Sequence, residues 1–309
     1  MAKSLLEQLP EIVKNGKRQA QQILEQLEGQ NRVSLQTREL VVPSRDTTAL
    51  ISSGQTLEDV PEEPNRLIYG DNLLAMAALL AGDENTPSTR GKVDLIYIDP
   101  PYDSKADYRT KVELPGAELD QKPNVLEQFA YSDMWTEGTA SYLEMMVPRI
   151  MLMKEMLRST GALLVHVDWH VGHYLKLILD DIMGKENFVN EIIWSYRSGG
   201  ASRKGSMPRK HDVIFLYRSS DEFVVNGQTE RQYLEKSFMG SLQDEAGRFY
   251  VDTILRDVLE GLIPVVNENG TISTFNTRPV LNLSSERTGY ATQKPEGLIE
   301  LLIRVAGPQ

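Results

Sequence analysis

Strand-like apolar runs alternate with helix-like segments along this chain, and that alternation limits its fold more than any other feature. Strand-like runs at 92–99 and 162–168 are separated by a helical pattern at 141–160, and another helical pattern follows at 171–184. Runs that are apolar on both faces suit strands buried between two layers. The alternation predicts an α/β fold whose mostly parallel sheet carries helices on both faces.

Local signals predict how the elements around this centre begin and end. The segment 66–70 is predicted to be a short strand, followed by a helix that Asp71 or Asn72 is suited to cap. The helix at 141–160 is expected to end at Gly161, with Pro148 near a kink or in the first turn.

Two apolar runs at 190–198 and 212–220 have no helix between them. They therefore predict an antiparallel hairpin at one edge of the sheet. Composition divides the chain into an amino-terminal helix with a polar linker, the alternating region, a polar and weakly periodic smaller subdomain, and a closing loop with an amphipathic helix. The boundaries are 1–65, 66–219, 220–288 and 289–309.

Charge and cysteine content exclude several functions. The net charge of −11 repels polyanions at long range, so nucleic acid would have to meet a locally basic surface. The Gly- and Ser-rich segment 197–211 contains five basic residues and no acid, which favours a phosphate-contacting loop over an incidentally charged one. Its basic residues are Arg197, Arg203, Lys204, Arg209 and Lys210.

The chain contains no cysteine, which excludes disulfides, thiolate metal sites and a cysteine nucleophile. No apolar run approaches the roughly 18 residues of a membrane helix, and the amino terminus lacks the apolar block of a secretory signal. A cytoplasmic protein without a membrane segment is expected.

The predicted strand at 92–99 ends in Asp99, which is followed by Pro100, Pro101 and Tyr102. Ligands of open α/β sheets bind outside the carboxyl ends of the strands. The prolines fix the backbone and remove two amide donors, so a carboxylate, a fixed carbonyl and an aromatic face come together. This set suits a flat ring with an exocyclic amine, whose two protons the acceptors would take. The simpler alternative is an ordinary proline turn with Asp99 as a cap.

In this context DLIYIDPPY resembles the catalytic motif of amino-directed DNA methyltransferases, which act on adenine N6 or cytosine N4. Four further segments are similar to other parts of that family: RLIYGDNLLAMAALL, the segment from GALLVHVDWH to NEIIW, KHDVIFLYRS and GYATQKPEGLIELLIRVA. The resemblance implies a Rossmann-like sheet with a target-recognition subdomain and transfer of a methyl group from S-adenosylmethionine to a base flipped out of double-stranded DNA. Asp before Pro-Pro-Tyr favours adenine N6, with cytosine N4 as the alternative.

The resemblance also implies a cofactor site. The methionine end of S-adenosylmethionine would lie beside the TQKP motif, with Lys294 on its carboxylate. Asp71 would lie near the adenosine, although a plain helix cap fits equally well. The implied cofactor-binding residues are Asp71, Thr292, Gln293, Lys294 and Pro295.

The order of these motifs is similar to that of a permuted class, the modification subunits of type III restriction systems. In that class a glycine-rich cofactor motif follows TQKP, and this chain reaches VAGPQ where that motif should begin. A truncated chain with an incomplete catalytic domain is therefore expected. A DNA-binding remnant without catalysis stays open, whereas a protein-glutamine or RNA methyltransferase is disfavoured because it would carry Asn at position 99.

The region 220–288 is expected to read the DNA sequence, with Arg248, Tyr250 and Arg256 as candidate contacts. A restriction subunit and a second copy of the chain are candidate partners of the amino-terminal helix, unless this helix only packs on its own domain. The cluster His166, Asp168, His170 and His173 fits no standard zinc spacing, so no metal is expected.

Overall fold

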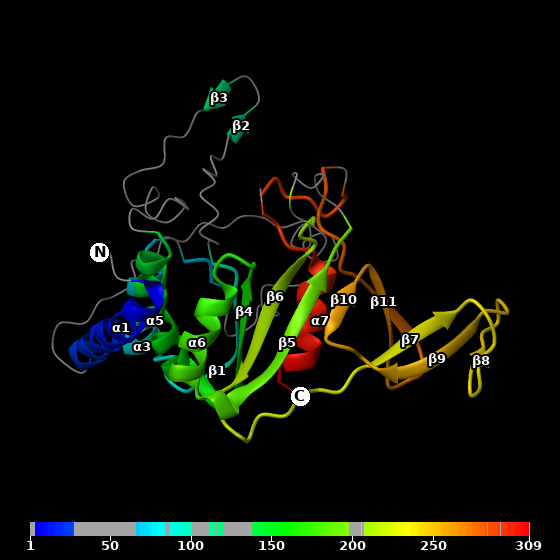
Figure 1. The fold of residues 1–309 in the computed structure, drawn as a ribbon, viewed down its shortest axis with the longest axis horizontal. Helices are drawn as coiled ribbons and strands as arrows, with labels where there is room; N and C mark the ends of the chain where they lie inside the picture. The colour runs from blue at the N-terminus through cyan, green and yellow to red at the C-terminus, as the bar shows by residue number, and fades with distance from the viewer. Residues whose placement is uncertain are drawn as a thin grey trace, which may run out of the picture.

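The computed structural model centres on one mixed sheet with helices on both faces, and a second sheet lies beside it (Figure 1). The sequence-distant helices α1 and α7 lie on opposite sides of the central sheet. The structure describes residues 4–27, 66–68, 70–83, 87–100, 112–114, 117–119, 138–197, 205, 207–282, 284–290 and 292–308.

The central sheet has the strand order β1-β4-β6-β5-β10. The pairs β1–β4 and β5–β10 are parallel, and β6 is antiparallel to both of its neighbours, so four strands run one way and β6 runs the other. This confirms the predicted α/β fold, the mostly parallel sheet and the antiparallel hairpin of β5 and β6. The hairpin is not at the edge of the sheet, because β10 pairs with the outer side of β5. The strands are β1 (Val93–Ile98), β4 (Leu157–Val167), β5 (Phe188–Ser195), β6 (His211–Arg218) and β10 (Val258–Glu260).

Helices cover the two faces of this sheet unequally. Among the described residues, four helices pack on one face, where Leu163, Val165 and Val167 of β4 point into the larger core. The other face is covered by α7, against which Ala162 and Leu164 point. The four helices are α1 (Leu5–Leu27), α3 (Asn72–Ala81), α5 (Thr139–Met156) and α6 (Gly172–Met183). The 3-10 turn η2 (Lys185–Asn187) follows α6. Helix α7 is Glu296–Ala306.

The predicted end of the α5 helix at Gly161 is wrong, because the helix ends at Met156 and β4 begins at Leu157. Gly161 lies inside this strand, where a Cβ atom would stand 2.9 Å from the carbonyl oxygen of Val93. The pairing of β1 with β4 shifts register at this point. Glycine is therefore required by the close approach of two strands and not by a helix terminus.

Pro148 lies in the middle of α5, not in its first turn, and is buried where α5 packs on α1. Gly16 of α1 makes this packing possible, since an added Cβ would overlap the side chain of Val147. The predicted strand at 66–70 is also wrong for residues 66–68, which form no strand.

The second sheet has the order β12-β11-β7-β9-β8 and lies to the side of the central sheet (Figure 1). Its strands are β7 (Thr229–Leu234), β8 (Leu242–Gln243), β9 (Phe249–Ile254), β11 (Leu262–Val266) and β12 (Ile272–Asn276). A separate hairpin joins β2 (Val112–Leu114) to β3 (Ala117–Leu119). Within the described ranges, no helix combines the length and apolarity needed to cross a membrane.

Candidate functional site

The carboxyl edge of the central sheet brings Asp99 and Lys294 together. Asp99 follows β1, and the Nζ atom of Lys294 donates to its Oδ2 at 2.5 Å. Both side chains are largely enclosed, with exposed fractions of 12% for Lys294 and 24% for Asp99. The DPPY and TQKP motifs therefore meet at one charged pair.

The loop before α7 is braced so that Lys294 points at this edge. The Oε1 atom of Gln293 accepts from the backbone N–H of Thr288 at 2.8 Å, and its Nε2 donates to the carbonyl of Glu286 at 2.7 Å. Pro295 is buried at the N-cap position of α7, and the carbonyl of Thr292 accepts a long 3.5 Å bond from Lys294. Each member of the TQKP motif thus helps to fix the loop or the helix entrance.

Asp71 is placed as a helix cap. Its Oδ1 accepts from the backbone N–H groups of Leu73 and Leu74 at 2.9 and 3.1 Å. Its Oδ2 lies 3.3 Å from Nη2 of Arg149. Burial lowers the pKa of Arg149, and the charge of Asp71 opposes that shift. Both carboxylate oxygens therefore have protein partners, as the simple cap interpretation requires.

The described basic residues on the predicted DNA side also have partners. Arg197 pairs with Glu260 at 2.7 Å, although its side chain is 91% exposed. The guanidinium of Arg209 stacks 3.6 Å from the ring centroid of Trp169. The carbonyl of Lys210 accepts from Tyr196 N–H at 2.9 Å.

In the second sheet, Arg248 pairs with Asp244 at 2.7 Å and lies over the ring of Tyr233. The other two candidates there are held similarly, since Arg256 pairs with Glu230 at 3.0 Å and Tyr250 is covered by the guanidinium of Arg231. Of the remaining predicted residues, Pro100 follows Asp99, while Pro101, Tyr102, Arg203 and Lys204 lie outside the described residues.

Sequence reasoning missed a buried polar row just below the Asp99 edge. Tyr97 Oη lies 2.6 Å from Nδ1 of the fully buried His166, whose Nε2 lies 3.4 Å from Oδ2 of Asp212. Tyr196 donates to the other oxygen of Asp212 at 3.2 Å. The sequence contained a signal for this row. Polar residues stand two positions apart in both Tyr97-Ile98-Asp99 and His166-Val167-Asp168, at the ends of two strands.

The histidines that raised the metal question are used differently. His166 belongs to the buried row, and Asp168 accepts from the backbone N–H of His170 at 2.9 Å and also contacts its ring. Burial raises the pKa of Asp168, and the hydrogen bonds from His170 oppose this shift. Among the described residues, no group of three or more His, Asp or Glu is arranged to hold a metal ion.

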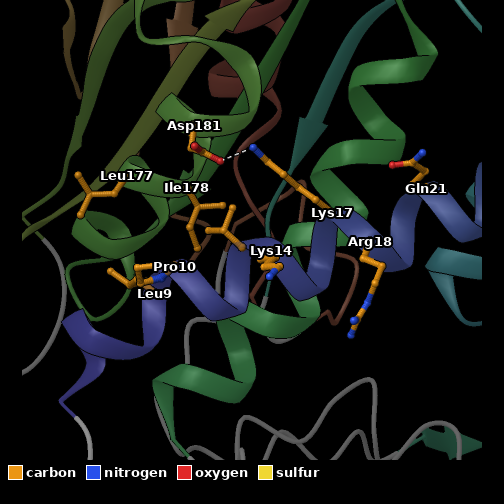
Figure 2. Close-up of a pocket in the computed structure, with 10 residues that line it drawn as sticks. Leu9, Pro10, Lys14, Lys17, Arg18, Gln21, Leu177, Ile178 and Asp181 are labelled. Carbon is orange, nitrogen blue, oxygen red and sulfur yellow. Dashed lines mark ion pairs between the residues drawn. The ribbon is translucent and has the colours of Figure 1, made fainter.

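A separate cavity of about 670 Å³ lies between α1 and α6 (Figure 2). Its floor includes Leu9 and Ile178, and Lys17 forms a 2.6 Å ion pair with Asp181 across it. No residue of the carboxyl edge lines this cavity. It is therefore a feature of the helical face and not of the candidate site.

The sequence of this chain is similar to those of known DNA methyltransferases. The family model described as DNA methylase matches residues 93–308. The type II methyltransferase M.EcaI of Enterobacter cloacae is 29% identical over 214 residues, covering 68% of this chain and 42% of that protein. The Mod subunit of the type III restriction-modification enzyme EcoP15I of Escherichia coli is 23% identical over 222 residues, covering 67% of this chain and 33% of the subunit.

A crystal structure of an M1.HpyAVI–SAM complex is 14% identical, covers 70% of this chain and 68% of its own, and has a TM-score of 0.32. The chain spans only about two-fifths of the length of M.EcaI and a third of the length of the EcoP15I Mod subunit.

Proposed function

We propose that this chain, which belongs to the DNA methylase family, transfers a methyl group from S-adenosylmethionine to the N6 amine of adenine in DNA. The observation that carries the proposal is the Asp99–Lys294 contact, because it joins the base-binding motif to the loop assigned to the cofactor. Family membership follows from the match over residues 93–308.

The role of Asp99 follows from its place at the end of β1. Its carboxylate and the carbonyl of Pro100 would accept the two protons of the exocyclic amine and so direct the nitrogen lone pair outward. This positioning raises electron density on the nitrogen and fixes its direction of attack. Tyr102 would stack on the flipped base, as the resemblance implies, and the adjoining Pro101 would help to fix the backbone.

The residues of the TQKP loop fit the amino-acid end of S-adenosylmethionine. When bound, this cofactor supplies an electrophilic methyl group carried on a sulfonium. Lys294 is a largely enclosed cation with three N–H donors, so besides its bond to Asp99 it can donate to the carboxylate of the cofactor. Thr292, Gln293 and Pro295 would hold this loop in place, and Asp71 stays a candidate near the adenosine.

DNA would lie across the carboxyl edge and reach the second sheet. Arg197, Arg203, Lys204, Arg209 and Lys210 would contact phosphates, and Arg248 would contact DNA from the region 220–288. This assignment keeps the domain boundaries at 1–65, 66–219, 220–288 and 289–309, with the third region as the target-recognition part. Acting on DNA, the protein would work in the cytoplasm.

The relatives support a role in a restriction-modification system, since one of the two described above is the Mod subunit of the type III enzyme EcoP15I. A restriction subunit is therefore the first candidate partner. In the structure α1 packs on α5 of its own domain, which leaves less of that helix for a second copy of the chain. Cytosine-N4 transfer and a non-catalytic DNA-binding remnant are the two alternative functions.

The decisive experiment is transfer of tritium-labelled methyl groups to unmethylated genomic DNA, followed by nucleoside mass spectrometry. N6-methyladenine supports the proposal, and N4-methylcytosine supports the first alternative. DNA binding without any transfer would contradict the proposal and favour the remnant. Asp99→Asn is the matched control, because it keeps the size of the side chain and removes its charge.

A further inference from the structure

The partners of His166 in the buried row below Asp99 determine which ring nitrogen of a neutral imidazole would carry the proton. Asp212 as a carboxylate can only accept, so the Nε2 atom of His166 must carry a proton to serve it. A neutral imidazole has one proton, and Nδ1 is then an acceptor for the hydroxyl of Tyr97 at 2.6 Å. The row therefore runs from the Tyr97 hydroxyl through His166 to Asp212, with Tyr196 closing it.

Tyr97 keeps its proton and needs an acceptor for it. Burial and then the charges of Asp99 and Asp212 raise the pKa of Tyr97. Asp99 directly follows β1, whose parallel register pairs Ile98 with Val165, so Asp99 stands beside His166, the residue that the Tyr97 hydroxyl contacts. A Tyr97 hydroxyl without His166 would therefore have the Asp99 carboxylate as a neighbouring acceptor.

We propose that His166 is a positioning residue of the base site, which holds the Tyr97 hydroxyl proton and so keeps Tyr97 from donating to Asp99. Asp99 is then left as an acceptor for the exocyclic amine of the target base. The inference rests on the proposed function, because it concerns how the same site receives its amine. It gives a chemical role to a histidine whose ring contacts Tyr97, Asp212 and the ring of Trp194.

A double-mutant cycle separates this role from a structural one. His166→Leu removes the acceptor and frees the Tyr97 hydroxyl, and methyl transfer to unmethylated genomic DNA should fall about 10- to 100-fold in kcat/KM. Tyr97→Phe in the same chain removes the competing hydroxyl, so the double variant should return to within about twofold of Tyr97→Phe alone. His166→Gln retains a donor and an acceptor and should lose less than His166→Leu.

Rescue is the result that a merely structural role does not produce. If both His166→Leu chains are equally impaired, with melting temperatures showing that they are folded, the positioning role is overturned while the proposed function stands. If the parent chain transfers no methyl group, the proposed function fails and this inference fails with it. The two failures are therefore distinguishable in one set of assays.

Nitrogen-15 NMR of the histidine rings gives a readout that needs no catalysis. The chain has four histidines, and the signal lost in His166→Gln assigns this ring. The expected spectrum shows a neutral ring with its proton on Nε2 and a hydrogen-bonded Nδ1, which shifts towards a free acceptor nitrogen in Tyr97→Phe. A proton on Nδ1, alone or together with Nε2, would overturn the inference even if His166→Leu did not fold.

Discussion

Lys294 Nζ lies 2.5 Å from Asp99 Oδ2, although 195 residues separate the two along the chain. The contact places the lysine ammonium group against the carboxylate that is proposed to accept a hydrogen bond from the exocyclic amine of the target base. Lys294 thus donates to one oxygen of Asp99. The pair links the two halves of the proposed reaction and makes each side chain a probe of the other.

Lys294→Met should weaken binding of S-adenosylmethionine, because the loop would lose the cation proposed to hold the cofactor carboxylate. It should also lower the free energy of unfolding by about 1–3 kcal/mol, since a largely enclosed carboxylate is left without its charged partner. Isothermal titration and urea unfolding measure the two effects. Lys294→Arg keeps the charge and is the control, and equal affinity in all three chains would remove Lys294 from the cofactor site.

Asp99→Ala should abolish methyl transfer and leave DNA affinity within about threefold of the parent, because phosphate contacts supply most non-specific affinity. Fluorescence anisotropy with labelled duplex DNA measures binding, and tritium incorporation measures transfer. Transfer by the alanine variant would show that another residue holds the amine.

Neutralising Arg209 and Lys210 to glutamine should weaken DNA binding and reduce the slope of log affinity against log salt by up to about 1.8, if each residue meets one phosphate. Lys14→Gln with Arg18→Gln removes the same charge beside the cavity of Figure 2 and is the matched control. An identical slope in both double variants would exclude the 197–211 segment from the DNA interface. A lowered slope only in the first would support it.

Gly161→Ala should destabilise the protein by about 1–3 kcal/mol, because its Cβ would stand 2.9 Å from the Val93 carbonyl and 3.1 Å from that of Asp94. Gly227→Ala is the control, since a Cβ there meets nothing within 4 Å. Urea unfolding of the two variants gives the comparison. Equal stability would mean that β1 and β4 do not approach as closely as the structure shows.

The sequence predicted the alternating strands and helices well because their apolar runs are long. It placed the end of α5 wrongly, since Leu157 continues the apolar pattern of the helix and begins the strand without a break. It could not predict that the three residues of β10 extend the central sheet, because three residues carry no period. Its assignment of 66–70 to a strand failed where residues 66–68 lack pairing.

The candidate site shows a similar division. Asp99 stood out because a carboxylate before two prolines ends a buried run, whereas Lys294 was found through resemblance to a family and not through spacing. The row of Tyr97, His166 and Asp212 went unnoticed because strand order, which brings the three together, is not written in any local pattern. His166 was considered as a metal ligand, yet its ring nitrogens contact a phenol and a carboxylate.

The most direct test of the account is calorimetric titration of the chain with S-adenosylmethionine, beside the Asp99→Ala and Lys294→Met variants. We expect saturable binding by the parent, similar binding by Asp99→Ala and weaker binding by Lys294→Met, because only the lysine is assigned to the cofactor. No saturable heat from the parent chain would contradict the account and favour a protein that binds DNA without its methyl donor.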